Sequence, residues 1–299
     1  MTQEQDNVAR LKDTVDAWHA SKGASTDRWL ALFTDDIDFR SLANGAASLA
    51  FTTHRSNKAG VVDYLANLTK QFDMIEYVDD EFIAEGNRVV AVGHCSFRNR
   101  ETGGVFDTPK IDVCTFRDGK ISAFHEYYDT LAIMQPEAKP FAPRVIAPGE
   151  RMSIQSLTTA DARKANVDIL RKGYESWRDS KGMNVDAWTL IMADNIRFQS
   201  VAAGGAALPF SRSRQGVDEA RGYLTEVTRD WTMIDFRMNE FIADRDYVVA
   251  VGSCHWTAKR NGIRVDTPKV DIWRMRDGRA VQFFEIFDTH AAFTAATSP

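Results

Sequence analysis

The spacing of apolar side chains changes partway along the first half of the chain, from a helical period to an alternation. Apolar residues first recur three or four positions apart, as on the buried face of a helix. This pattern predicts a helix over residues 6–21, a second short helix around Trp29 and a third helix over residues 59–72. Between the last two, residues 37–41 alternate as a strand, and residues 43–50 read as a loop of small side chains.

The next part of the same half alternates and is rich in Val, Ile, Phe and Tyr, which predicts strands. The predicted strands cover residues 74–85, 87–99, 105–117 and 120–129, and glycine-containing turns separate them. The fold class is therefore α+β, with three N-terminal helices packed on a curved antiparallel sheet. Such a sheet, closed by helices, makes a cone-shaped barrel whose mouth admits a small apolar ligand.

The whole pattern occurs twice in the chain. A constant offset of 159 positions carries Trp18 to Trp177 and the segment EFIA at 81–84 to the same four residues at 240–243. The offset does not slip before the end of the chain. Because solenoid repeats are only roughly 20 to 50 residues long, a repeat of this length predicts a duplicated domain.

We expect copy 1 over residues 1–134, a linker over 135–164 and copy 2 over 165–299. The linker holds half of the 8 prolines, namely Pro136, Pro140, Pro143 and Pro148. Proline disfavours both helix and central strand, so the linker is expected to be extended and semi-rigid.

Composition and charge limit the possible functions. Lys and Arg number 37 against 42 Asp and Glu, a net charge of −5, so no excess of positive charge favours nucleic acid as a partner. No apolar run approaches the roughly 18 residues that cross a bilayer, and the first residues lack the pattern of a signal peptide, which predicts a cytoplasmic protein without membrane contact. The 3 cysteines show no metal-ligand spacing, and we expect neither a metal nor another cofactor.

The order of helices, strand and long meander resembles a known superfamily. The meander ends in RDGKISAFHEYYDT in copy 1 and in RDGRAVQFFEIFDT in copy 2. These features resemble nuclear-transport-factor-two-like proteins, in particular their SnoaL-like branch, and the resemblance covers both copies. The resemblance implies a cystatin-like α+β barrel in each copy. Members include ketosteroid isomerases, polyketide cyclases, limonene epoxide hydrolases, scytalone dehydratases, lyases of lignin-derived aromatic dimers and many non-catalytic binding domains.

The resemblance implies a role for two carboxyl groups in each copy. Ketosteroid isomerases carry a protonated aspartic acid on the strand before the last hairpin, which donates to the substrate oxyanion, and Asp112 and Asp271 match it. Polyketide cyclases and limonene epoxide hydrolases carry a proton-transferring carboxylate on the final strand. Glu126 and Glu285 match that group.

Two registers of the last hairpin are possible, and they differ in whether Asp112 and Glu126 share a face. A two-residue turn sets Asp112 opposite His125 and leaves Glu126 on the other face. A three-residue turn with Gly119 in a bulge sets Lys110 opposite Glu126, with Asp112 on the same face. We favour the bulge, because it places the carboxyls among the apolar residues of both strands.

Apolar neighbours would remove water from these carboxyl groups, raise their pKa and make them usable acids or bases near neutral pH. A second interpretation is that a lysine and two carboxylates form only an ion-pair network that holds the hairpin. The residues expected to bind substrate are Lys110, Lys269, Ser96, Ser253, Tyr128 and Trp273. Trp273 replaces Cys114 of copy 1 and is expected to narrow the second cavity.

The long strand carries a histidine and a serine in opposite order in the two copies, as His94-Cys95-Ser96 and as Ser253-Cys254-His255. The Arg and Asp of limonene epoxide hydrolases would fall at these positions, so epoxide hydrolysis is not supported in detail. If this face lines the cone, each copy offers an imidazole that assists proton transfer. If the intervening cysteines face inward instead, the histidines lie outside.

We therefore expect a cofactor-independent acid/base enzyme of the lyase, dehydratase, isomerase or cyclase type. The expected catalytic residues are Asp112, Glu126, His94, Asp271, Glu285 and His255. The substrate would be an apolar, ringed molecule such as a lignin-derived aromatic dimer, a steroid-like compound or a polyketide. Because Ser41 and Ser200 occupy the position of the isomerases' general base, simple ketosteroid isomerisation is not expected.

The alternative is a non-catalytic binding or assembly domain pair whose carboxyl groups serve the structure. The resemblance also implies packing of the two copies as an intramolecular pseudo-dimer, and a homodimer of the whole chain is open as well.

Overall fold

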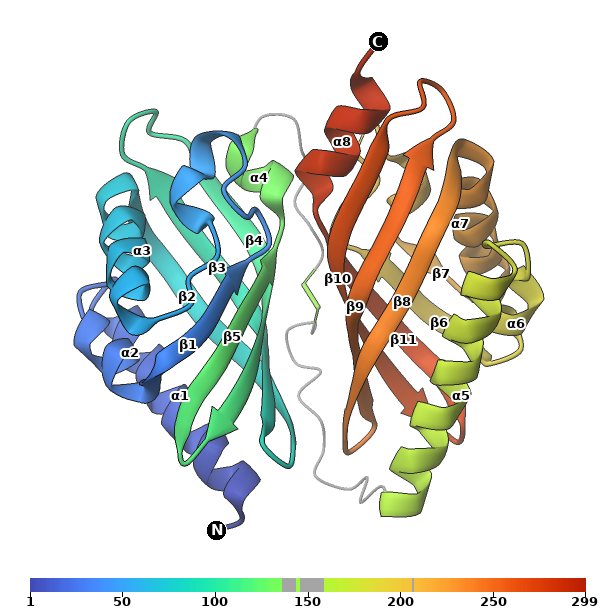
Figure 1. Ribbon diagram of the computed structural model, residues 1–299. Coiled ribbons are helices and arrows are strands. Elements are labelled where there is room, and N and C mark those ends of the chain that lie inside the picture. Colours follow the sequence, from blue (N-terminus) through green and yellow to red (C-terminus); the bar gives the residue numbers. More distant parts are fainter. Residues whose placement is uncertain (136–143, 146–158, 206) are drawn as a thin grey trace. The chain divides into compact units, whose positions relative to one another are not determined.

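The chain divides into two compact units, Met1–Arg151 and Met152–Pro299 (Figure 1). The computed structural model describes residues 1–135, 144–145, 159–205 and 207–299. The four prolines of the expected linker lie outside the described residues, so its extended form stays a prediction. The first helix of the second unit begins at Ala160, before the boundary expected at residue 165.

Copy 1 folds as three helices and a strand followed by a meander. Its elements are α1 (Gln3–Ala20), α2 (Thr26–Leu32), β1 (Phe33–Ser41), the 3₁₀ helix η1 (Ala47–Thr52), α3 (Lys58–Gln71), β2 (Phe72–Glu85), β3 (Arg88–Asn99), β4 (Val105–Arg117), β5 (Lys120–Tyr128) and α4 (Thr130–Met134). Each predicted helix and strand is present. The pattern did not indicate η1, which lies partly in the expected loop, or α4.

Copy 2 repeats this order. Its elements are α5 (Ala160–Asp179), α6 (Val185–Thr189), β6 (Met192–Ser200), the 3₁₀ helix η3 (Pro209–Ser211), β7 (Arg214–Gln215), α7 (Val217–Asp230), β8 (Trp231–Asp244), β9 (Tyr247–Ala258), β10 (Arg264–Arg276), β11 (Arg279–Phe287) and α8 (Thr289–Thr297). Figure 1 shows the first three helices of each unit against one face of its sheet.

The sheets confirm the predicted α+β class but differ from the prediction in two respects. The strand orders are β1-β5-β4-β3-β2 and β7-β6-β11-β10-β9-β8, so the described strands form open sheets rather than closed barrels. The first long strand of each copy also runs parallel to the last one, β1 to β5 and β6 to β11, whereas the other pairs are antiparallel. Each sheet is therefore mixed.

The hairpin between β4 and β5 brings the two carboxyl groups of copy 1 face to face. Its two-residue turn has positive φ at both Asp118 (51°) and Gly119 (73°), the pattern of a type I′ turn. A bulge then inserts Ser122 into β5, and Asp112 pairs directly with Glu126. The prediction of a bulge at Gly119 in the turn is therefore wrong. The alternative register, in which Asp112 lies opposite His125, is wrong as well. The expectation that the two carboxyl groups share a face is confirmed.

The edge strand of each sheet approaches its neighbour so closely that only glycine fits. A Cβ on Gly93 would lie 1.8 Å from the carbonyl oxygen of Val78, and one on Gly252 would lie 1.9 Å from that of Arg237. The pairing of β2 with β3 and of β8 with β9 shifts register just after these contacts. The glycines thus permit the bend that curves the edge strand over the helices.

We predict that Gly252→Ala lowers the free energy of unfolding by about 1 to 3 kcal/mol, because the added methyl group must displace backbone. Gly222→Ala is the matched control, since a Cβ on this glycine of α7 meets nothing within 4 Å. That substitution should leave the stability unchanged or raise it by about 0.5 to 1 kcal/mol. Urea unfolding measures both, and equal midpoints for the two variants would contradict the close approach.

Candidate functional site

Copy 2 contains a cavity of about 100 Å³ between its helices and its sheet. Twelve of its 21 lining residues are aromatic, and the charged ones are Lys269, Asp271 and Glu285. All three charged residues are at least nine-tenths buried. Drug-sized ligands occupy pockets of roughly 300 to 1,000 Å³, so a ligand of that size requires the walls of this cavity to move.

Lys269 is the centre of the polar group in copy 2. Its Nζ lies 2.8 Å from Oδ1 of Asp271 and also forms an ion pair with Glu285. Burial alone would lower the pKa of Lys269, but the two carboxylates raise it above its usual value, so the ammonium stays charged. Burial raises the pKa of Asp271 to about 6, against the opposing charge of Lys269.

Two tyrosines complete this group. Tyr174 on α5 donates to Oδ2 of Asp271 at 2.6 Å and accepts a hydrogen bond of 2.7 Å from the indole of Trp273. Tyr223 on α7 donates to Glu285. The ring of Trp273 stacks on Trp188 at 5.2 Å between centroids, so this residue lines the cavity without closing it.

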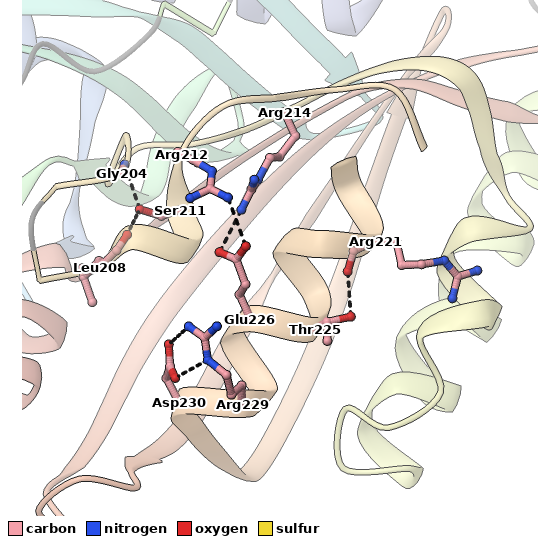
Figure 2. Close-up of polar contacts among 10 residues, drawn as sticks. All are labelled: Gly204, Leu208, Ser211, Arg212, Arg214, Arg221, Thr225, Glu226, Arg229 and Asp230. Carbon is pink, nitrogen blue, oxygen red and sulfur yellow. Dashed lines mark hydrogen bonds and ion pairs between the residues drawn. The ribbon is translucent and has the colours of Figure 1, made fainter. Parts of the chain in front are cut away.

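A salt-bridge cluster ties one wall of this cavity together. Glu226 on α7 accepts from Arg212 at 3.1 Å and from Arg214 at 2.8 Å (Figure 2). The same segments supply Phe210 and Tyr223 to the cavity lining. Movement of this wall for a larger ligand would therefore have to strain or break these ion pairs.

Copy 1 holds the same lysine with a third carboxyl group. The Nζ of Lys110 lies 2.6 Å from Oδ2 of Asp112 and forms a second ion pair with Asp79, and all three side chains are 2 to 3% exposed. Tyr77 on β2 donates to Asp112 at 3.1 Å, and the ammonium of Lys110 lies 4.3 Å from the centre of the Tyr77 ring. The ammonium is therefore held by charge and by an aromatic face.

Glu126 lies beside this group and is half-buried as a whole residue, whereas Asp112 is buried. Tyr64 on α3 donates to it, while Tyr128 and Ser41 are hydrogen bonded to each other at 2.6 Å on the same face. Loss of water around the carboxyl raises the pKa of Glu126 to about 7, although hydrogen bonds from Ser41 and Tyr64 act to lower it. A group with this pKa can both give and take a proton at neutral pH.

Comparison with known proteins decides the family. The SnoaL-like domain model matches residues 11–124 and 171–283, which together make up more than half of the chain. This chain belongs to the SnoaL-like domain family. The tandem duplication expected from the sequence is thereby confirmed. No curated protein matches the chain.

Three solved structures similar to this chain each align with 45% of it. An NTF2-like protein of unknown function from Burkholderia pseudomallei is 23% identical, with 45% of this chain and 98% of that chain covered and a TM-score of 0.39. An NTF2-like protein from Burkholderia xenovorans is 24% identical, with the same coverage and a TM-score of 0.39. TerC, crystallised with polyporic acid, is 23% identical, with 45% and 99% covered and a TM-score of 0.39.

The histidines of the long strands lie outside the SnoaL-like cones, so the prediction that they line the cavities is wrong. Alternation along β9 points Cys254 into the cavity and His255 away from it, where its Nδ1 lies 2.6 Å from Asp266. In β3, His94 faces away in the same manner and contacts Glu76 and Asp80.

By the same alternation, Ser96 and Ser253 share the outward face with these histidines. The expectation that the two serines bind substrate in the cavity is therefore wrong. By contrast, Lys110, Lys269, Tyr128 and Trp273 face inward beside the carboxyl groups.

Of the tyrosines in the two sites, the sequence indicated only Tyr128; the tyrosines on the helices, Tyr77 on β2 and the carboxylate of Asp79 were missed. Tyr64 and Tyr223 occupy equivalent positions, so the internal repeat could have indicated them. Asp79 stands in the acidic run VDDE, which is typical of a solvated strand edge. Neither a metal-binding group of His, Cys, Asp and Glu nor a helix able to span a membrane is found among the described residues.

We predict that Glu126→Gln changes how the stability of the protein depends on pH. The folded pKa of about 7 lies above the ordinary glutamate pKa of 4.5, so the stability linked to this proton is complete below pH 4.5 and is lost as pH rises through 7. The variant cannot ionise there. Its stability relative to the wild type should therefore rise by up to about 3 kcal/mol between pH 4.5 and pH 8.

Urea unfolding of both proteins across this range measures the difference. A difference that stays constant with pH would show that Glu126 ionises as readily in the folded chain as in the unfolded one.

Proposed function

We propose that this chain is a cofactor-independent acid/base enzyme that acts on an apolar, ring-containing small molecule, and that Glu126 moves the proton. The observation that carries the proposal is a carboxyl group on the apolar inner face of copy 1 that accepts a hydrogen bond from Tyr64 and has a pKa of about 7. Structural ion pairs also perturb pKa values, but Glu126 has no cation within ion-pair distance among the described residues. This favours the catalytic interpretation for Glu126.

The neighbouring groups suit the stabilisation of negative charge on a substrate oxygen. Lys110 keeps its charge, and burial raises the pKa of Tyr77 well above its usual value, so its hydroxyl stays a donor. Asp112 accepts from both groups, which is the arrangement of an ionised carboxylate. We therefore assign the donor role expected for Asp112 to Lys110, which would withdraw charge from a carbonyl or leaving-group oxygen while Glu126 takes or delivers the proton; Tyr77 gives its one hydroxyl proton to Asp112 and holds that carboxylate in place.

The geometry fits proton abstraction next to a carbonyl, elimination of water and ring closure equally well, because each requires one base and one oxygen-stabilising group. The apolar, largely aromatic lining of the cavity in copy 2 favours aromatic or polycyclic ligands. Lignin-derived aromatic dimers, steroid-like compounds and polyketides belong to this class.

A second candidate function, binding without catalysis, is favoured for copy 2 by one observation. Glu285 lines the cavity but is 5% exposed and is paired with Lys269, so it has a counter-ion that Glu126 lacks. We propose that copy 2 binds an apolar molecule.

The test begins with a thermal-shift screen of apolar aromatic, steroid-like and polyketide compounds, since a ligand that binds the folded state raises its melting temperature. Stabilising compounds are then incubated with the wild type and analysed for turnover. In Glu126→Gln, kcat should fall by about 10² to 10⁴, while the thermal shift with ligand is retained.

Glu285→Gln is the matched control from the other copy, and it should retain turnover. Unchanged turnover in the double variant would remove the acid/base assignment. Stabilisation by ligands without turnover of any of them would favour binding as the function of both copies.

A further inference from the structure

The two cones differ by a charge at one position of the edge strand. Asp79 in β2 corresponds to Met238 in β8, at the offset that relates the copies. In both copies this residue pairs near the glycine at which the edge strand bends, Gly93 or Gly252. The bend turns Asp79 inward to Lys110, and Met238 packs against the core of copy 2.

In copy 1 the lysine forms ion pairs with two carboxylates, and Glu126 is not one of them. Lys110 forms ion pairs with Asp112, on its own strand, and with Asp79, on the edge strand. Glu126 is not within ion-pair distance of it, although Asp112 and Glu126 are directly opposite each other across the hairpin.

In copy 2 the equivalent lysine forms an ion pair with the glutamate of the final strand. With a methionine at position 238, Lys269 forms ion pairs with Asp271 and with Glu285. One buried ammonium thus has two carboxylate partners in each cone, and the second partner is the edge-strand aspartate in copy 1 and the final-strand glutamate in copy 2.

We propose that Asp79 is a positioning residue that selects the catalytic copy: by engaging Lys110 it leaves Glu126 without a cation and free to exchange a proton, whereas the absence of this carboxylate in copy 2 locks Glu285 in an ion pair. This inference rests on the proposed acid/base function of Glu126. It also explains why two cones with the same lysine, aspartate and glutamate need not do the same work.

The other groups that face Glu126 do not explain why the lysine has a different second partner in each copy. Those groups are Ser41 on β1, Tyr64 on α3, Tyr77 on β2, Asp112 and Lys110 on β4, and Tyr128 on β5. The serine, the aspartate, the lysine and the Tyr64 position have the same residue type in copy 2, and the remaining two tyrosines are replaced by Phe236 and Phe287. None of these replacements changes the charge. When Asp79 is added to these residues, it is the one position at which the charge differs between the copies.

The test follows the ionisation of Glu126 directly, without a substrate. The protein is labelled with carbon-13 at the glutamate side-chain carboxyl, and the signal of Glu126 is assigned by its loss in Glu126→Gln. We expect the titration midpoint of Glu126 to fall by about 1 to 3 pH units in Asp79→Asn, because Lys110 then turns to Glu126 and one negative charge is gone. Asp79→Met, which copies the second cone, should lower it as well.

The reciprocal variant Met238→Asp should raise the midpoint of Glu285, and Met238→Leu is its control for a change of side chain without charge. The isosteric Asp79→Asn keeps the test valid if Asp79→Met fails to fold. An unchanged midpoint of Glu126 in Asp79→Asn would overturn the proposal, since a merely structural role lowers the melting temperature without moving the titration.

Activity separates this inference from the proposed function. If Glu126 titrates as expected in all variants but no compound is turned over, the role of Asp79 stands and the enzymatic function falls. If turnover depends on Glu126 but the titration midpoint of Glu126 does not change in the Asp79 variants, the enzymatic function stands and the role of Asp79 falls.

Discussion

Each cone buries one lysine ammonium among aromatic side chains, and this charge must be balanced by groups of the protein itself. Removing an ion from water costs several kcal/mol even after relaxation, and only close counter-ions and hydrogen bonds offset it. Lys110 and Lys269 are 3% and 4% exposed at the side chain, with an aspartate two residues further along the same strand. Because alternate residues share a face, the Lys-x-Asp spacing alone supplies the first counter-ion.

The second counter-ion decides what chemistry the cone can carry. Copy 1 has three carboxyl groups for one ammonium, and copy 2 has two. Among buried side chains, an excess of carboxyl groups favours keeping a proton on one of them. In copy 1 that carboxyl is Glu126, which has a tyrosine donor and a pKa of about 7. The duplication thus preserves one scaffold while a single side chain on the edge strand changes its proton balance.

The sequence was sufficient for the fold because its signals are local. Helical spacing, alternation and glycine turns located the elements, and the internal repeat established two domains. The pairing of β1 with β5 was not predictable in this way, since a strand pattern does not specify which strand lies beside it. The register of the last hairpin was missed for a related reason: a bulge at Ser122 leaves no clear sequence signal, yet it moves every later side chain.

The candidate site was predicted in part. Asp112, Glu126 and Lys110 were found because they alternate on one face with apolar residues. His94 and His255 were misplaced because their strands carry apolar residues on both faces, so the pattern did not show which face is inside. Asp79 was missed because its inward direction depends on the bend permitted by Gly93, which is a tertiary feature.

The most direct test of this account is an infrared difference spectrum of wild type minus Glu126→Gln at pH 6. A carboxyl group with a pKa of about 7 is mostly protonated at this pH, whereas solvated glutamates are ionised. The account predicts a positive band of a protonated carboxyl group that disappears as the pH is raised to 9. A spectrum that shows only carboxylate bands at pH 6 would contradict it.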